Sequence, residues 1–289
     1  ASNLTESIPP CTTIALPEVT EASTLVSASY SGSPFETSIA VCNQHLEIGM
    51  PSTIDQVLCR DGYAAGYNYA NKTSDWVSYY ITSESVSITM NRVDSFAEDQ
   101  EIPDQFRSTL SDYSGSGYDR GHQAPRATVD FTESSMEESF LLSNIAPQQP
   151  DFNQGVWANV EQAIRDCAVE HDNLHVVTGV ANSIDNNNAI GNSVKVPTYF
   201  YKAILKLDSP ASAFAVLFIN NETDKGRVYS IDTLEDFIHK DFFSNLVDEV
   251  ENEVETNAVS FCSNLMLSPD SPSTEVCGTK TTCGEMNSC

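Results

Sequence analysis

The tetrapeptide Asp119-Arg120-Gly121-His122 combines an acid, a cation and a base, and Arg126 follows shortly afterwards. The chain has only 5 His and 14 Lys+Arg against 41 Asp+Glu, so the grouping stands out. A neutral imidazole can accept a proton near neutral pH, and arginine is suited to bidentate contact with phosphate. These residue types suit proton transfer and phosphate binding, and Gly121 would let a ligand approach the backbone closely.

A second group of polar residues follows at helical spacing. Asn153, Trp157, Glu161 and Arg165 recur every four residues and therefore form a stripe along one side of a predicted helix. Taken alone, the stripe fits an exposed helix face with a Glu-Arg pair better than a functional site.

The order of these motifs resembles a known family. DRGHQAP, at residues 119–125, is followed by SNIAPQQPDFNQGVWANVEQAIR at residues 143–165. The combination resembles the DNA/RNA non-specific endonucleases, the ββα-metal or His-Me finger group that also contains endonuclease G. The resemblance is closest from Asp119 to Arg165 and extends more loosely from about Asp75 to Phe261. It implies hydrolysis of phosphodiester bonds in DNA and RNA, giving products with 5′-phosphates.

The resemblance also implies residue roles. His122 is expected to be the general base, and Asn153 is expected to bind one Mg²⁺ ion directly, with Mn²⁺ as a substitute. Glu161 is expected to hold the ion through water. The other expected active-site residues are the catalytic Arg120, Arg92, Asn144 and Arg165, and the substrate-binding Arg126 and Asp119.

The elements that must position these residues are predicted from hydrophobic patterning. Strands are expected at 75–82 and 85–91, paired as a hairpin, and at 140–149, 173–180, 198–207 and 211–220. Helices are expected at 151–170 and about 233–254. In the second helix Leu246, Val250 and Val254 recur every four residues, so the run DEVENEVE is interpreted as a solvated face rather than a metal site. The pattern predicts an α+β fold with a central, mostly antiparallel sheet and flanking helices, and the resemblance implies a ββα-metal motif within it.

The cysteines bear on domain organisation and compartment. The chain contains 8 Cys without a C-x-x-C pair, which favours a disulfide framework and an oxidising compartment. Residues 1–59 lack Lys and Arg and are expected to form a disulfide-tethered arm, residues 60–265 the catalytic domain and residues 266–289 a Cys-rich tail. A chain that opens at Ala1 fits a secreted, extracellular protein whose signal peptide has been removed. No apolar run is long enough to span a membrane, and no obligate protein partner is evident.

The net charge of −27 gives a competing signal. A strongly acidic protein repels polyanions, which taken alone argues against a nucleic-acid partner. Two alternatives to the nuclease therefore stand: an acidic binding protein that imitates nucleic acid, and a phosphodiesterase acting on small nucleotides. If the protein is a nuclease, screening of its charge predicts tolerance of salt or activation by it.

Overall fold

A seven-stranded antiparallel sheet forms the centre of the fold. The computed structural model describes residues 42–91, 95–221, 223, 225–256 and 260–265. The strand order is β1-β2-β3-β6-β9-β10-β11, and every neighbouring pair is antiparallel. This confirms the predicted α+β class. The strands are β1 Gln56–Cys59, β2 Ala64–Asn68, β3 Thr73–Ile81, β6 Leu174–Ala181, β9 Tyr199–Lys206, β10 Ser212–Ile219 and β11 Arg227–Tyr229.

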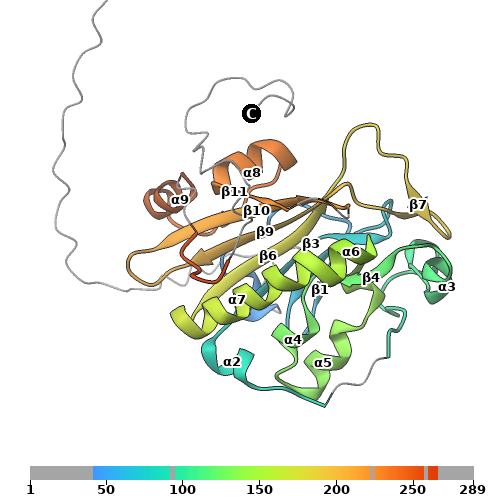
Figure 1. Ribbon diagram of the computed structural model, residues 1–289, viewed down its shortest axis with the longest axis horizontal. Helices are drawn as coiled ribbons and strands as arrows, with labels where there is room; N and C mark the ends of the chain where they lie inside the picture. Colours follow the sequence, from blue (N-terminus) through green and yellow to red (C-terminus); the bar gives the residue numbers. More distant parts are fainter. Residues whose placement is uncertain (1–41, 92–94, 222, 224, 257–259, 266–289) are drawn as a thin grey trace, which may run out of the picture. The chain divides into compact units, whose positions relative to one another are not determined.

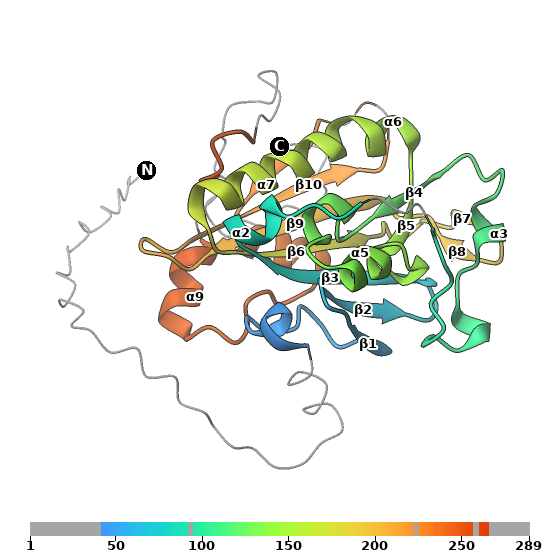
Figure 2. The ribbon, with the colours of Figure 1, turned by 90° about the horizontal axis from the view of Figure 1, so that it is seen from below.

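Both faces of this sheet are covered. Helix α7, Ala158–His171, packs on one face, and helices α8, Ile231–Ile238, and α9, Asp248–Glu255, pack on the other (Figures 1 and 2). Along β9, Phe200 and Ile204 belong to the α7 side, while Tyr201, Ala203 and Leu205 belong to the α8 and α9 side. A strand that is buried on both faces is apolar throughout. This explains why β6, β9 and β10 are recognisable as apolar runs.

A smaller unit carries the polar motifs. Strand β4, Asp119–His122, pairs antiparallel with β5, Ile145–Gln148. The chain then enters α6, Pro150–Phe152, passes through the π-helical segment η4, Asn153–Trp157, and continues into α7. The result is a ββα arrangement and confirms the helix predicted at 151–170. Gly155, with φ −103° and ψ −108°, interrupts the helical geometry between Asn153 and Trp157.

The remaining elements are short and connect or flank these two units. They are η1 Asn43–Leu46, α2 Ser83–Ser87, η2 Asp104–Phe106, α3 Leu110–Tyr113, α4 Arg126–Val129, α5 Glu133–Ser139, η3 Leu142–Asn144, β7 Ala189–Ile190 and β8 Val194–Lys195. Within the described ranges, every helix is too short or too polar to cross a lipid bilayer.

Two disulfides are present among the described cysteines. Cys42 pairs with Cys59, and Cys167 on α7 pairs with Cys262. Strand β1 and η1 lie before the predicted boundary at residue 59, and β1 is part of the central sheet. Residues 1–41 of the predicted arm, and the predicted tail beyond residue 265, lie outside the described residues.

The predicted hairpin at 75–82 and 85–91 is wrong in its second half. Residues 83–87 form helix α2, and β3 pairs instead with β2 and β6. The cause is a capping box: Ser85 N donates to Thr82 Oγ1 at 3.0 Å, while Thr82 N donates to Ser85 Oγ at 2.9 Å. This reciprocal pair satisfies two backbone N–H groups and starts a helix locally. It outweighs the β-branched character of the sequence that follows.

The single helix predicted at about 233–254 is also wrong. Helix α8 ends at Ile238, and His239 adopts a left-handed conformation with φ +55°. Phe242 and Phe243 then enter the core before α9 begins at Asp248. Burial of these two aromatic rings stabilises the fold more than continuation of the helix would. The chain therefore turns inward at this point.

Candidate active site

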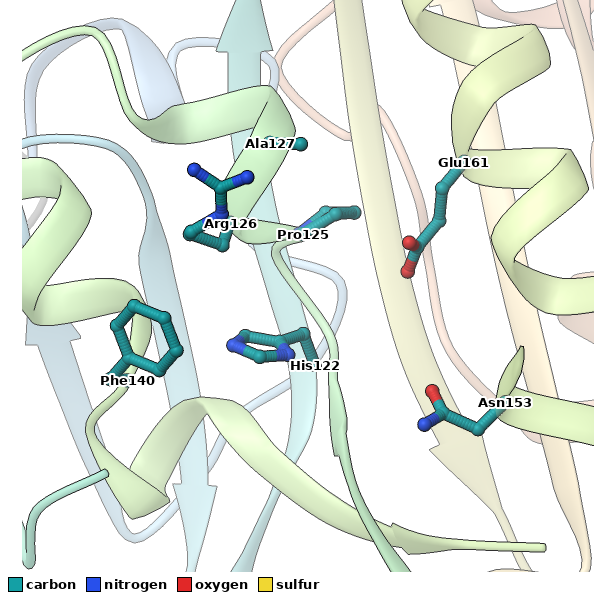
Figure 3. Close-up of a pocket in the computed structure, with 7 residues that line it drawn as sticks. All are labelled: His122, Pro125, Arg126, Ala127, Phe140, Asn153 and Glu161. Carbon is teal, nitrogen blue, oxygen red and sulfur yellow. The ribbon is translucent and has the colours of Figure 1, made fainter. Parts of the chain in front are cut away.

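A pocket of about 190 Å³ forms where β4, the start of α4 and the α6–α7 helix meet. It is lined by His122, Pro125, Arg126, Ala127, Phe140, Asn153 and Glu161 (Figure 3). Three of the residues expected to perform the chemistry, which are separated in sequence, therefore face one space. The Asn153 carboxamide and the Glu161 carboxylate approach it from one side, and the His122 ring lies on the other side, next to Phe140.

His122 lies at the end of β4 and is held between aromatic rings. Its ring centroid is 5.5 Å from that of Phe96 and 5.4 Å from that of Phe140. The side chain is half-buried. These contacts restrict rotation of the imidazole and keep one edge toward the pocket, which suits a group that must accept a proton from one defined position.

Hydrogen bonds to Asp119 fix the orientation of the Asn153 side chain. Asn153 Nδ2 donates to Asp119 Oδ2 at 2.9 Å, and Gln154 Nε2 donates to the same oxygen at 2.8 Å. A carboxylate can only accept hydrogen bonds, so the NH₂ group of the Asn153 side chain must face Asp119. The carbonyl oxygen is consequently turned into the pocket, beside Glu161 (Figure 3). An oxygen presented in this way fits a hard divalent cation.

Glu161 lies on α7, where burial and neighbouring cations have opposite effects on its pKa. Burial raises the pKa of Glu161, while the charges of Lys202 and Arg165 lower it. Lys202 is fully buried on β9, where its Nζ donates to Thr178 Oγ1 at 2.7 Å and lies 4.4 Å from the Trp157 ring. Burial lowers the pKa of Lys202, and the Glu161 charge opposes that effect. Each of the two groups therefore stabilises the charged form of the other.

Sequence reasoning missed Lys202. Its signal was a lysine inside the apolar run of β9, where a cation is costly unless it has partners. The sequence does not show that β9 passes beneath α7. Only this packing brings Lys202 close to Glu161 and Trp157.

The predicted arginines differ in their positions and in their partners, and Arg126 is the one that lines the pocket among the described residues. Arg120 is exposed, and its guanidinium carbon lies 4.3 Å above the Phe96 ring, in an adjoining groove that shares Asn153 with the pocket. Arg165 donates to Thr128 and Gln162. Arg126 forms an ion pair of 2.7 Å with the buried Asp130, so part of its charge is already balanced. Arg92 lies outside the described residues.

Asn144 does not line the pocket. It is fully buried, its Oδ1 accepts from Ala124 N, and its Nδ2 donates to the carbonyl oxygens of Ala124 and Ser139. The side chain therefore fixes the backbone just after His122.

Gly121 also differs from expectation. A Cβ at this position would lie 2.0 Å from Gln148 Oε1, so the glycine makes room for the Gln148 side chain rather than for a ligand.

Comparison with known proteins agrees with this geometry. The DNA/RNA non-specific endonuclease family matches residues 42–264. The chain belongs to this family. A nuclease from Nostoc sp. is 33% identical over 235 residues, covering 73% of this chain and 85% of its own. Nuclease C1 of Cunninghamella echinulata is 37% identical over 174 residues, covering 55% and 69%. Human mitochondrial endonuclease G is 33% identical over 168 residues, covering 54% and 56%.

Solved structures give the same result. A chain from the crystal structure of the EndoG/EndoGI complex matches with a TM-score of 0.63 and 28% sequence identity, covering 71% of this chain and 91% of that one. The family is metal-dependent, and Asn153 with Glu161 forms the part of the pocket whose oxygens suit a cation. The protein is thus a DNA/RNA endonuclease of the His-Me finger type, and its ββα unit carries the pocket.

Proposed function

We propose that this endonuclease hydrolyses phosphodiester bonds of both DNA and RNA with one Mg²⁺ ion and leaves 5′-phosphate ends. The observation that carries the proposal is the shared pocket, which His122 lines from one side and Asn153 and Glu161 line from the other. A base and a pair of oxygen ligands on opposite sides of one space suit attack by water on a phosphate that lies between them.

Each side chain has a separate task in this mechanism. His122 accepts the proton of the attacking water. Asn153 would hold Mg²⁺ through Oδ1, and Glu161 would hold it through water. The chemistry supplied by a bound ion would be polarisation of the phosphate and stabilisation of the leaving 3′ oxygen. Asp119 keeps the Asn153 amide from rotating, as its hydrogen bond to Nδ2 indicates.

The arginines complete the site. Arg126 lines the pocket and Arg120 lines the adjoining groove, while Arg165 lies on α7 and donates to Thr128 of α4; the three would balance the charge that develops on phosphate. Arg120 is exposed, whereas Arg126 and Arg165 are partly buried, so Arg120 is suited to reach the polymer backbone. Phosphate contacts carry no direct base information, so recognition of this kind is compatible with cleavage of DNA and RNA alike.

We further propose that the protein works outside the cell. The Cys42–Cys59 and Cys167–Cys262 disulfides support an oxidising compartment. The net charge of −27 supports function in a saline medium, where screening limits repulsion from the substrate.

The experiment that tests the mechanism compares cleavage of supercoiled plasmid and of single-stranded RNA by wild type and His122→Ala. Each is assayed with Mg²⁺ and with EDTA, and circular dichroism checks the fold of the variant. We expect wild type with Mg²⁺ to cut both polymers, and EDTA or the substitution to lower both rates at least 100-fold. Undiminished cleavage by a folded His122→Ala would overturn the assignment of the base. Turnover of small nucleotide diesters without polymer cleavage would identify a phosphodiesterase instead.

A further inference from the structure

A cluster of three acidic side chains lies on the face of the sheet opposite to α7. Asp232 and Glu235 are on α8, and Glu255 ends α9. One carboxylate oxygen of each lies within 4.8 Å of the others. Asp232 and Glu235 are three residues apart on one helix and so point the same way, whereas Glu255 approaches from a different helix.

Glu255 is the unusual member of this group. Its residue is only 7% exposed, and its Oε1 has no hydrogen-bond partner among the described residues. This contradicts the prediction that DEVENEVE is a solvated face, although Asp248, Glu249 and Glu253 of that run are exposed. Burying a carboxylate oxygen without a donor costs free energy, and the cost grows when other carboxylates are close.

The surrounding charges are also acidic. Burial, together with the nearby carboxylates of Glu235, Glu251, Asp232 and Asp241, raises the pKa of Glu255 to about 9. Glu235 Oε1 accepts a hydrogen bond from Phe242 N, which fixes that side chain in place. Lys240, which follows α8, instead donates to Ser52 Oγ at 3.3 Å. The group therefore lacks a positive charge among the contacts found for it in the described part of the chain.

We propose that Asp232, Glu235 and Glu255 bind a calcium ion that links α8 to α9. Calcium prefers oxygen ligands at about 2.3–2.6 Å and takes several waters when the protein supplies few ligands. Two oxygens on opposite sides of one such ion are separated by at most about 5 Å, which the observed spacing satisfies. Magnesium binds at about 2.0–2.1 Å and requires nearly ideal octahedral geometry, so a loose group from two helices suits it less well.

The position of the group indicates what the ion would do. Leu234 on α8 and Val254 on α9 are both buried against the same face of the sheet. A cation between these helices would satisfy the buried oxygen of Glu255 and hold both helices on that face. Binding to the folded chain alone raises its stability by mass action. We therefore expect calcium to raise thermal stability. It should not affect the chemistry in the pocket, because the pocket lies on the other face of the sheet.

The test measures calcium binding by isothermal titration calorimetry and calcium-dependent melting temperature by calorimetry. It compares wild type, Glu255→Gln, Asp232→Asn and Glu249→Gln. Glu249→Gln is the matched control, since it removes the same charge from an exposed position of α9. The catalytic pocket is intact in all four proteins, so any calcium bound there cancels in the comparison.

We expect Glu255→Gln and Asp232→Asn to weaken calcium binding at least tenfold and to abolish most of the calcium-dependent rise in melting temperature. Glu249→Gln should behave as wild type, and a tenfold excess of Mg²⁺ should not displace calcium. Asp232 is exposed, so its variant keeps the test decisive if Glu255→Gln does not fold. Equal calcium binding by Asp232→Asn and wild type would overturn the proposal. So would absence of calcium binding in wild type, which would leave Glu255 as a buried, protonated carboxyl.

Discussion

At the scale of single residues, the site depends on how Asn153 is held. One Asp119 oxygen receives hydrogen bonds from Asn153 Nδ2 and from Gln154 Nε2. Since a carboxylate cannot donate, this contact permits only one orientation of the Asn153 amide. The residue that precedes Arg120 in the DRGH motif therefore determines which atom of Asn153 faces the pocket.

Asp119→Asn tests this dependence. The new amide can donate as well as accept, so the Asn153 side chain can rotate and present nitrogen to the pocket. We expect cleavage of plasmid to fall by roughly 10- to 100-fold, the usual effect of losing a group that orients a metal ligand, with a higher Mg²⁺ concentration needed for half-maximal rate. Initial rates measured across a Mg²⁺ series check this.

Gln154→Ala supplies the comparison for that variant. It removes a hydrogen bond to the same Asp119 oxygen, but Gln154 is exposed and outside the pocket. Its Mg²⁺ dependence should stay close to wild type. If Asp119→Asn also retained the wild-type Mg²⁺ dependence, the orienting role of Asp119 would be disproved.

At the scale of elements, the sequence predicts those helices and strands whose conformation is determined by residues close together along the chain. Helix 151–170 and strands β6, β9 and β10 follow from periodicity and from apolar runs. The motif residues His122, Asn153 and Glu161 likewise follow from the sequence, and they meet in one pocket. The errors at 85–91 and 233–254 arose where a local cap or a buried aromatic pair overrode propensity.

Other features depend on contacts between distant segments. Lys202 acquires its significance from packing beneath Trp157. Gly121 is required by Gln148 across the β4–β5 ladder, and Asn144 bonds the backbone at Ala124. None of these pairings has a signal in the surrounding sequence, because the sheet brings them together only after folding.

The strand β6 contains a histidine that should make stability depend on pH. His175 is 5% exposed, its Nδ1 has no hydrogen-bond partner in the described part of the chain, and its ring packs 4.8 Å from that of Tyr80. Burial, and to a smaller extent the neighbouring His45, lowers its pKa to about 4. Between this value and the ordinary value of 6.5, the unfolded chain binds more protons than the folded one. The contribution of His175 is therefore fully present above pH 6.5 and is lost as pH falls toward 4.

Replacing His175 with Phe tests this contribution. From pH 7 to pH 4.5, the free energy of unfolding of wild type should fall by on the order of 2 kcal/mol more than that of His175→Phe. Urea unfolding at both pH values provides the measurement. His239→Asn, which replaces an exposed histidine, should keep the wild-type pH dependence. Identical pH dependence in wild type and His175→Phe would show that His175 is not kept neutral by burial.

At the scale of the whole molecule, the charge of −27 opposes the substrate while the arginines attract it. Added salt weakens arginine–phosphate contacts through counterion release. It also shortens the Debye length from about 10 Å at 0.1 M to about 3 Å at 1 M, which removes the general repulsion. When only a few arginines contact phosphate, the second effect dominates at first. The rate should therefore pass through a maximum at elevated salt.

This maximum can be separated from other effects of salt by changing the protein charge. We expect kcat/KM on plasmid, measured at constant Mg²⁺ across a NaCl series, to rise and then fall. In Glu133→Gln/Glu137→Gln, which removes two exposed charges from α5, the maximum should move to lower salt because less repulsion has to be screened. A dinucleotide substrate should show a weaker dependence, since it carries far fewer phosphates. A monotonic fall with salt on plasmid would mean that arginine contacts dominate at every ionic strength and that the acidic surface does not limit encounter.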